Sequence, residues 1–130
     1  MAIQDLVGQK IVRIEKNDDN DRLLFYCENG RVYLMYHAQD CCESVSIDDI
    51  NGELKDLIGW PVLSAEETSN SQEADGGRET WTFYHIRNFL TTVTIKWYGS
   101  SNGYYSEDVS FVELEKKGID NIQDTQFEIV

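Results

Sequence analysis

The sequence has little positive charge and few of the residue types that build catalytic or metal sites. Its 130 residues include 11 Lys and Arg against 24 Asp and Glu, so the net charge is −13, and there are only two His and three Cys. No apolar run approaches the roughly 20 residues that a membrane-spanning helix needs. The first residues carry no basic segment and no hydrophobic signal core. We therefore expect a cytoplasmic protein that contacts no membrane and uses no cofactor.

The acidity excludes one class of partner and leaves three interpretations open. A phosphate backbone would be repelled by most of this surface, so we predict no direct binding to nucleic acid. The acidic side chains serve solubility, imitate nucleic acid at a basic site of another protein, or bind a divalent cation. The acidic stretch at residues 17–21 lacks the central Gly and the later Glu of a calcium loop, so we interpret it as a hairpin turn.

Cysteine and histidine side chains are the candidates for soft metal ligands. His37 precedes the adjacent pair Cys41 and Cys42, and His85 would have to complete a zinc site from another strand. A structural zinc site takes four ligands, usually in spaced pairs, and adjacent cysteines rarely point at one metal. A Cys–His nucleophile would need an orienting third group, and the sequence supplies no signal for one. We therefore interpret the thiols, Cys27 included, as reduced, buried and unreactive, and we expect no enzyme.

Alternation of apolar and polar residues predicts a chain that is mainly β. The pair Asn29-Gly30 predicts a hairpin, because both residues tolerate positive φ. One short helix is expected at residues 53–58, where Leu54, Leu57 and Ile58 share one face. The expected strands are residues 10–15, 23–27, 31–36, 44–48, 61–65, 80–86, 91–97 and 109–114.

The polar stretch at residues 66–79 predicts a flexible surface loop, because it has too few apolar residues to pack. Strand patterning resumes directly after it, so we expect a single β-rich domain at residues 1–117. Residues 118–130 are predicted to form a C-terminal tail or a short edge strand. The predicted fold class is mainly β (α+β), either a twisted antiparallel sheet or a small β-sandwich with one short helix.

Aromatic, amide and hydroxyl side chains concentrate around a predicted turn at residues 96–106. Such residues offer flat, amphipathic surface with hydrogen-bonding tips, which interfaces and ligand pockets favour. One interpretation is a hairpin whose aromatic rings pack the sheet; the other is a recognition surface with a single lysine as its cation. The candidate binding residues are Lys96, Trp97, Tyr98, Ser101, Asn102, Tyr104 and Tyr105.

Four blocks of the sequence resemble an uncharacterised family of small bacteriophage and prophage proteins. The blocks are residues 41–45 (CCESV), 52–59 (GELKDLIG), 82–84 (TFY) and 97–106, which contain WYG and SNGYYS. The resemblance extends over residues 8–115. It implies a viral origin and a location in the host cytoplasm, and it brings no activity and no site residues.

The acidity, the missing catalytic motif and this resemblance together predict a non-catalytic protein that inhibits a host defence protein through its acidic surface. A second hypothesis is a sponge for a nucleotide signal, because bases stack on aromatic rings such as those of residues 97–106. A third is an accessory structural domain of the phage. The expected partner is a host protein or, in the second hypothesis, a small molecule, and a homo-oligomer stays open.

Overall fold

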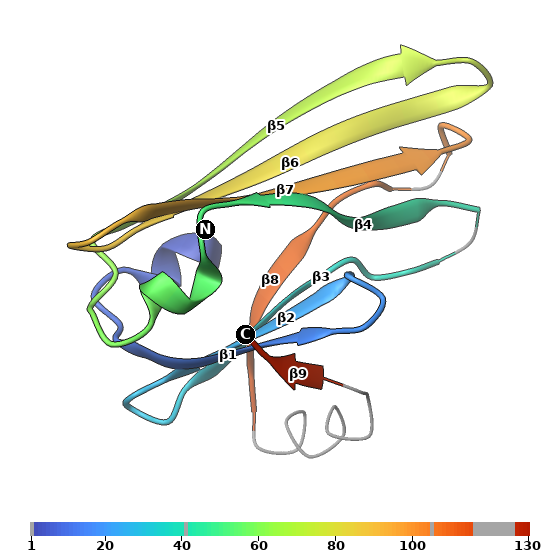
Figure 1. The fold of residues 1–130 in the computed structure, drawn as a ribbon. Coiled ribbons are helices and arrows are strands. Elements are labelled where there is room, and N and C mark those ends of the chain that lie inside the picture. The colour runs from blue at the N-terminus through green and yellow to red at the C-terminus, as the bar shows by residue number, and fades with distance from the viewer. Residues whose placement is uncertain (1, 41, 105, 116–126) are drawn as a thin grey trace.

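The chain folds into two antiparallel β-sheets that face each other (Figure 1). The computed structural model describes residues 2–40, 42–104, 106–115 and 127–130. The elements in chain order are the 3-10 helix η1 (Ala2–Leu6), β1 (Ile11–Asn17), β2 (Arg22–Cys27), β3 (Val32–Tyr36), β4 (Ser44–Asn51), the 3-10 helix η2 (Leu54–Leu57), β5 (Ser64–Ala74), β6 (Gly77–Arg87), β7 (Thr92–Ser101), β8 (Ser110–Leu114) and β9 (Phe127–Ile129). One sheet has the strand order β8-β3-β2-β1-β9 and the other β4-β7-β6-β5. The predicted mainly-β class, in its small β-sandwich form, is confirmed.

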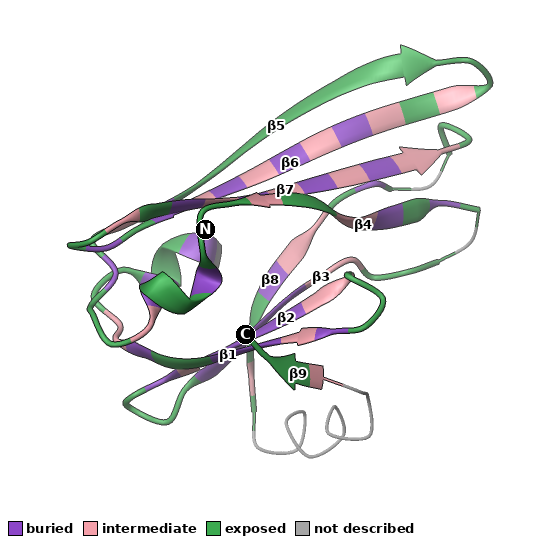
Figure 2. Ribbon diagram, viewed as in Figure 1, coloured by how far each residue is buried: buried purple, intermediate pink, exposed green. Residues whose placement is uncertain are grey.

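Alternate residues of the strands fill the space between the sheets. On β7, Val93, Ile95 and Trp97 are buried, whereas the residues between them are partly exposed. Figure 2 shows this alternation as purple and pink bands along β6 and β7. Because each large apolar side chain contributes about 1.5–3 kcal/mol when fully buried, these inner faces hold the two sheets together. Both 3-10 helices add to the same core through buried leucines, Leu6 of η1 and Leu54 of η2.

Two predicted hairpins are confirmed. Gly30 has a φ of 89° and donates its N–H to the carbonyl of Cys27 at 3.0 Å, which closes the turn between β2 and β3. The acidic stretch at residues 17–21 forms the turn between β1 and β2. There the side-chain oxygen of Asn17 accepts the backbone N–H groups of Asp21 and Arg22, each at 3.0 Å.

The prediction of a flexible loop at residues 66–79 is wrong. All 11 residues of β5 pair with β6 in one unbroken antiparallel register, from Ser64 opposite Arg87 to Ala74 opposite Gly77. A polar sequence can form an edge strand because the backbone supplies the hydrogen bonds, while the neighbouring strand carries the apolar side chains. Here β6 is anchored to β7 along its length and serves as the template for β5.

Two other predicted elements differ in detail from the structure, and the short edge strand expected near the C-terminus is present. The helix expected at residues 53–58 is the single 3-10 turn η2, and it buries Leu54 and Leu57 as the pattern indicated. The strand expected at residues 61–65 begins only at Ser64, after isolated bridges made by Pro61 and Val62. Phe127–Ile129 forms β9, which pairs with β1 at the edge of the five-stranded sheet. Residues 118–126 of the predicted tail lie outside the described residues.

Within the described part of the chain, no helix has the length and apolar character needed to cross a membrane.

Gly99 provides a test of the close packing between β7 and the segment that precedes β8. A Cβ added to Gly99 would lie 2.8 Å from the Cβ of Glu107 and 2.9 Å from a methyl group of Val45. We expect Gly99→Ala to lower the free energy of unfolding by about 1–3 kcal/mol, because extra atoms in a filled space force displacements. Urea denaturation measures the change. Ser100→Ala, the next and partly exposed position, is the control and should change it by less than about 0.5 kcal/mol; equal midpoints for both variants would contradict the packing.

Candidate functional site

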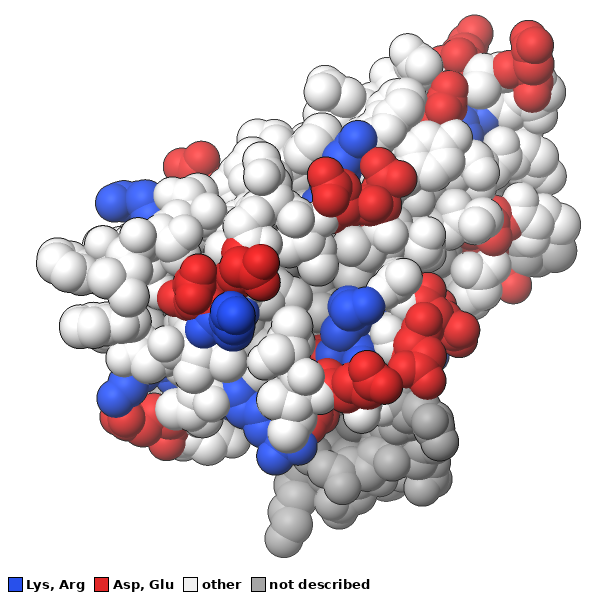
Figure 3. Space-filling view, viewed as in Figure 1, with Lys and Arg blue, Asp and Glu red and all other residues white. Residues whose placement is uncertain are grey.

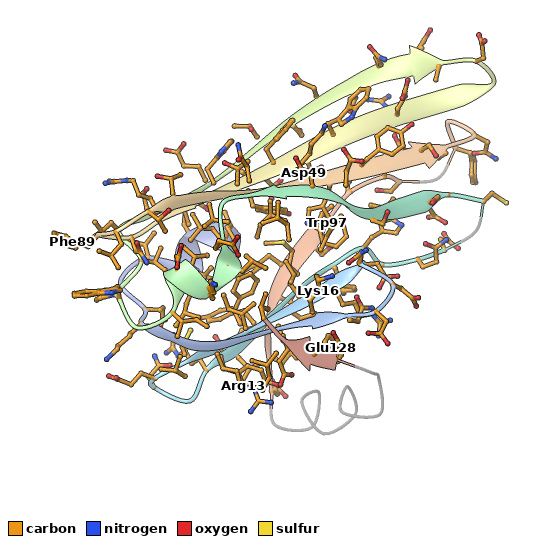
Figure 4. All side chains as sticks on the ribbon, viewed as in Figure 1. Arg13, Lys16, Asp49, Phe89, Trp97 and Glu128 are labelled. Atoms are coloured by element: carbon orange, nitrogen blue, oxygen red, sulfur yellow. The ribbon has the colours of Figure 1, made fainter. Side chains whose placement is uncertain are left out.

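The predicted binding residues do not form one surface. Trp97 lies between the sheets, is 1% exposed and donates its indole N–H to the sulfur of Met35 at 3.2 Å (Figure 4). It is therefore a core residue, and the binding role predicted for it is withdrawn. Lys96 and Tyr98 are its neighbours on β7, and the strand alternation places them on the opposite, outer face of the four-stranded sheet.

The outer face carries an aromatic pair, of which the sequence predicted only Tyr98 as a binding residue. Trp81 lies opposite Tyr98 in the register, and the centroids of the two rings are 5.4 Å apart. The Tyr98 hydroxyl donates to a Glu79 carboxylate oxygen at 2.8 Å, while the ammonium of Lys96 lies 3.0 Å from the carboxylate of Asp48. The alternation of residues 80–86 could have predicted the position of Trp81, because a strand sends every second side chain to the outer face. The lysine expected to be a cation for a ligand is thus already paired within the sheet.

Ser101 is the last residue of β7, and Asn102 and Tyr104 lie in the turn after β7, which the buried carboxylate of Glu107 holds. The hydroxyl of Ser101 donates to one oxygen of Glu107 at 2.8 Å, and Thr80 donates to the other at 3.0 Å. Asn102 accepts the backbone N–H of Tyr104 at 2.9 Å, and the Tyr104 residue is 83% exposed. Tyr105 lies outside the described residues.

An open pocket of about 300 Å³ lies between this turn and the β5–β6 hairpin, with Ser71, Arg78, Tyr104 and Glu107 among its lining residues. Both oxygens of Glu107 already accept hydroxyl hydrogen bonds, and the guanidinium of Arg78 lies 3.6 Å from one of them. The charge of this carboxylate is therefore balanced inside the protein. Its evident role is to hold the turn against β6 and β7.

His37 and His85, the two histidines considered as zinc ligands, lie in different environments. The Nε2 atom of His37 lies 3.3 Å from a carboxylate oxygen of Glu43, and both side chains are buried. His85 lies on the outer face of β6, where its Nδ1 atom is 3.1 Å from the hydroxyl of Thr94. Among the residues that the structure describes, no group of three His, Cys, Asp or Glu side chains is placed to hold a metal ion. Cys41 is not among them.

The two described cysteines differ in environment. Cys27 is 4% exposed at the end of β2, as the sequence predicted, whereas Cys42 is exposed and has a positive φ of 63°. The expectation that all the thiols are buried is therefore wrong for Cys42. Burial, more than any neighbouring charge, raises the pKa of the Cys27 thiol from its ordinary 9.0 to about 11. The fold thus favours the neutral thiol at this position.

The pH dependence of stability tests this burial. Since the folded pKa of Cys27 lies above its ordinary value, the stability contributed by the neutral thiol is complete below pH 9 and is lost as the pH rises through about 11. Chemical denaturation of the wild type and of Cys27→Ala across this range measures it. We expect the difference in free energy of unfolding to shift steadily against the wild type as the pH rises. A difference that stays constant would contradict the burial.

Acidic side chains do not form a continuous phosphate-like array on the face shown in Figure 3. They lie there in separate groups divided by uncharged residues, and several groups have a Lys or Arg beside them. Ion pairs also neutralise individual carboxylates, including Lys10 with Glu28 at 3.2 Å and Lys96 with Asp48 at 3.0 Å. This face gives the nucleic-acid mimic no support.

Large apolar side chains are exposed at the end of the sandwich where β6 turns into β7. We name Trp60, Leu63, Phe89 and Leu90 the apolar tip; their exposed fractions are 43%, 49%, 74% and 60%. The rings of Trp60 and Phe89 are 5.7 Å apart, and the backbone N–H of Leu63 donates to the carbonyl of Arg87 at 2.8 Å. Figure 4 shows Phe89 at the extreme end of the molecule. Exposed apolar groups of this kind commonly mark interaction sites.

A buried asparagine fixes the conformation of the apolar tip. Asn88 is 2% exposed and donates from its amide to the carbonyl of Asp56 at 2.9 Å. Its side-chain oxygen accepts the backbone N–H groups of Leu90 at 2.8 Å and of Thr91 at 2.9 Å. Phe89 and Leu90 therefore project from an ordered turn. The sequence could have predicted this exposure, because Phe89 and Leu90 are two bulky apolar residues in the short connection between two predicted strands.

Substitution of Asn88 tests whether its side-chain hydrogen bonds hold the turn in this conformation. We expect Asn88→Ala to lower the free energy of unfolding by about 1–3 kcal/mol, because it leaves buried polar groups without partners. Amide hydrogen exchange at Leu90 and Thr91 should quicken at the same time. Asn70→Ala, at an exposed position of β5, is the control and should leave both measurements unchanged. Unaltered exchange in Asn88→Ala would contradict the role assigned to this side chain.

A family model described as a domain of unknown function, DUF7448, matches residues 4–111. The matched span extends from η1 to the first residues of β8, so it includes the apolar tip and the whole four-stranded sheet. No curated protein and no solved structure matches the chain.

Proposed function

We propose that this chain, which belongs to the DUF7448 family of unknown function, is a non-catalytic binding protein that docks onto another protein through its apolar tip. The observation that carries the proposal is the ordered turn at which Phe89 and Leu90 are 74% and 60% exposed while Asn88 is buried beneath them. Aromatic and aliphatic side chains that enter a pocket of a partner contribute most of the binding energy in many interfaces. A turn that is already ordered loses little entropy when it binds.

The apolar side chains of the tip and the net charge of the chain indicate what kind of pocket the partner has. Phe89 and Leu90 require an apolar pocket, and Trp60 beside them widens the contact. The net charge of −13 favours a pocket with a basic rim, because opposite charges speed the encounter and favour the correct partner. The resemblance to phage proteins makes a host defence protein the partner that we propose, with inhibition as the consequence of occupying its pocket.

The nucleotide-signal hypothesis has less support than protein binding. Trp97 is buried and cannot stack on a base, and Lys96 is paired with Asp48. Arg78 and Glu107 both line the pocket beside the turn after β7, and the guanidinium of Arg78 already lies 3.6 Å from a carboxylate oxygen of Glu107, so this cation is not free to pair with a phosphate. An exposed apolar tip does not contribute to binding a small charged ligand.

The double substitution Phe89→Ser, Leu90→Ser tests the proposal. Proteins captured from a bacterial lysate are compared by quantitative mass spectrometry, and the leading partner is then purified for affinity measurements. We expect the double variant to bind it at least about thirtyfold more weakly, since the loss of even one hot-spot residue costs about 2 kcal/mol or more. Val112→Ser removes an apolar side chain that is 38% exposed on β8, and it should bind like the wild type.

Two other measurements with the same variants test whether the apolar tip instead mediates self-association or membrane binding. Size-exclusion chromatography with light scattering reports self-association, and flotation with neutral phosphatidylcholine vesicles reports membrane binding. A wild-type dimer that Phe89→Ser, Leu90→Ser dissociates would overturn the proposal of a different protein as partner. Vesicle binding that depends on the tip would overturn it as well, and so would equal affinity of all variants for the purified partner.

A further inference from the structure

The longest sheet edge among the described residues is β5. In the five-stranded sheet the edge strands β8 and β9 have only 5 and 3 residues. In the four-stranded sheet, β4 has 8 residues and a register shift between Ile47 and Asp49, whereas β5 has 11 residues in continuous register. An edge strand presents unpaired backbone groups to solvent, and a long, regular edge is the best template for another strand. The strand β5 is therefore the edge best suited to strand addition.

Three devices that commonly protect an edge strand, namely Lys, Pro and bulges, are missing from β5, and its charged residues are all acidic. Its sequence, SAEETSNSQEA, contains no Lys and no Pro, and its pairing with β6 contains no bulge. Every residue from Glu66 to Ala74 is exposed. Figure 1 shows the far ends of β5 and β6 extending clear of the five-stranded sheet. A partner strand can therefore approach along most of this edge.

Side chains of β6 hold β5 in place and make its edge an ordered template. The hydroxyls of Ser71 and Thr80 are 2.8 Å apart, and the amide of Gln72 donates to a carboxylate oxygen of Glu79 at 3.1 Å. These bonds lie in the half of the hairpin that contains the turn, where few core residues support the strand. An ordered edge loses little conformational entropy when another strand pairs with it.

Charge selects the occupant of this edge. Glu66, Glu67, Glu73 and Asp75 lie along β5 and its turn, and no basic residue occurs in residues 64–77. A second copy paired antiparallel about Asn70 would set Glu67 against Glu73 at both ends, and such like-charge pairs are destabilising. An extended segment that carries Lys or Arg at alternate positions would instead place its cations on one face of the sheet, beside Glu67 and Glu73, which share a face of β5. The edge thus favours a basic strand over a copy of itself.

We propose that β5 binds an extended, basic segment of a partner protein, which adds a fifth strand to the four-stranded sheet. Backbone hydrogen bonds would supply affinity, and the carboxylates of β5 would select the charge of the segment. This inference goes beyond the proposed function, because it uses a different surface and does not depend on the apolar tip. The two surfaces are nevertheless continuous, since Leu63 of the apolar tip directly precedes Ser64, the first residue of β5.

The probe for this proposal is the synthetic peptide Lys-Val-Lys-Thr-Lys-Val-Lys-Thr, titrated into the full chain and followed by amide chemical shifts and calorimetry. We expect saturable binding, shifts and slowed amide exchange in β5, and no change along β4 or β8. The same peptide with every backbone amide nitrogen methylated keeps its charge but cannot donate along either edge, and it should not bind. Equal binding of the methylated peptide would overturn strand addition.

Charge variants separate recognition of β5 from general attraction to an acidic protein. Glu67→Gln, Glu73→Gln should bind the peptide about fivefold more weakly, as expected for the loss of two exposed ion pairs on the face that meets the lysines. The control Asp18→Asn, Asp19→Asn removes the same charge from exposed positions elsewhere and should bind like the wild type. Equal weakening in both variants would overturn the proposal. Phe89→Ser, Leu90→Ser should bind the peptide normally, so failure of the strand proposal and failure of the proposed function are distinguishable.

Discussion

The contact between the inner faces of the two sheets is the constraint on which the rest of the structure depends. Trp97 lies at the middle of this contact, on β7 of the four-stranded sheet, and its indole N–H reaches the sulfur of Met35 on β3 of the other sheet. A buried indole needs both apolar surroundings and a partner for its N–H group, and here both come from the opposing sheet. Because β7 is fixed in this way, β6 pairs with it and adds Tyr84 and Ile86 to the core, and β5 then extends the sheet by pairing with β6.

The apolar tip and the exposed edge of β5 both follow from the way the two sheets pack. The turn between β6 and β7 has to reverse the chain at the end of the sandwich, and the buried Asn88 ties it to the segment that contains η2. The reversal leaves Phe89 and Leu90 outside the core. At the other end, β5 and β6 run past the edge of the opposing sheet, so their polar residues have no core to join. An apolar tip and a long polar edge therefore follow from the unequal lengths of the two sheets.

The sequence predicts features that depend on local patterns, and it fails for features that depend on pairing between distant segments. The alternation of Val93, Ile95 and Trp97 predicts a half-buried strand, and β7 has that pattern. The pair Asn29-Gly30 predicts a hairpin because its backbone preference is local. The polar stretch at residues 66–79 was misjudged because its strand structure depends on pairing with β6, a non-local partner. In the same way, Lys96 and Trp97 were grouped as one site because they are adjacent in sequence, although a strand sends adjacent side chains to opposite faces.

By itself, the sequence determined the β class, the hairpin at Asn29-Gly30 and the strong acidity, because these depend on side-chain periodicity, local backbone preference and composition. Only the tertiary structure decided which aromatic residues are buried, which carboxylates are neutralised by neighbours and which apolar residues stay outside. Phe89 and Leu90 have the same apolar character as many core residues, and only the position of their turn at the end of the sandwich exposes them. Burial and pairing depend on contacts between segments far apart in the chain, and no local pattern records those contacts.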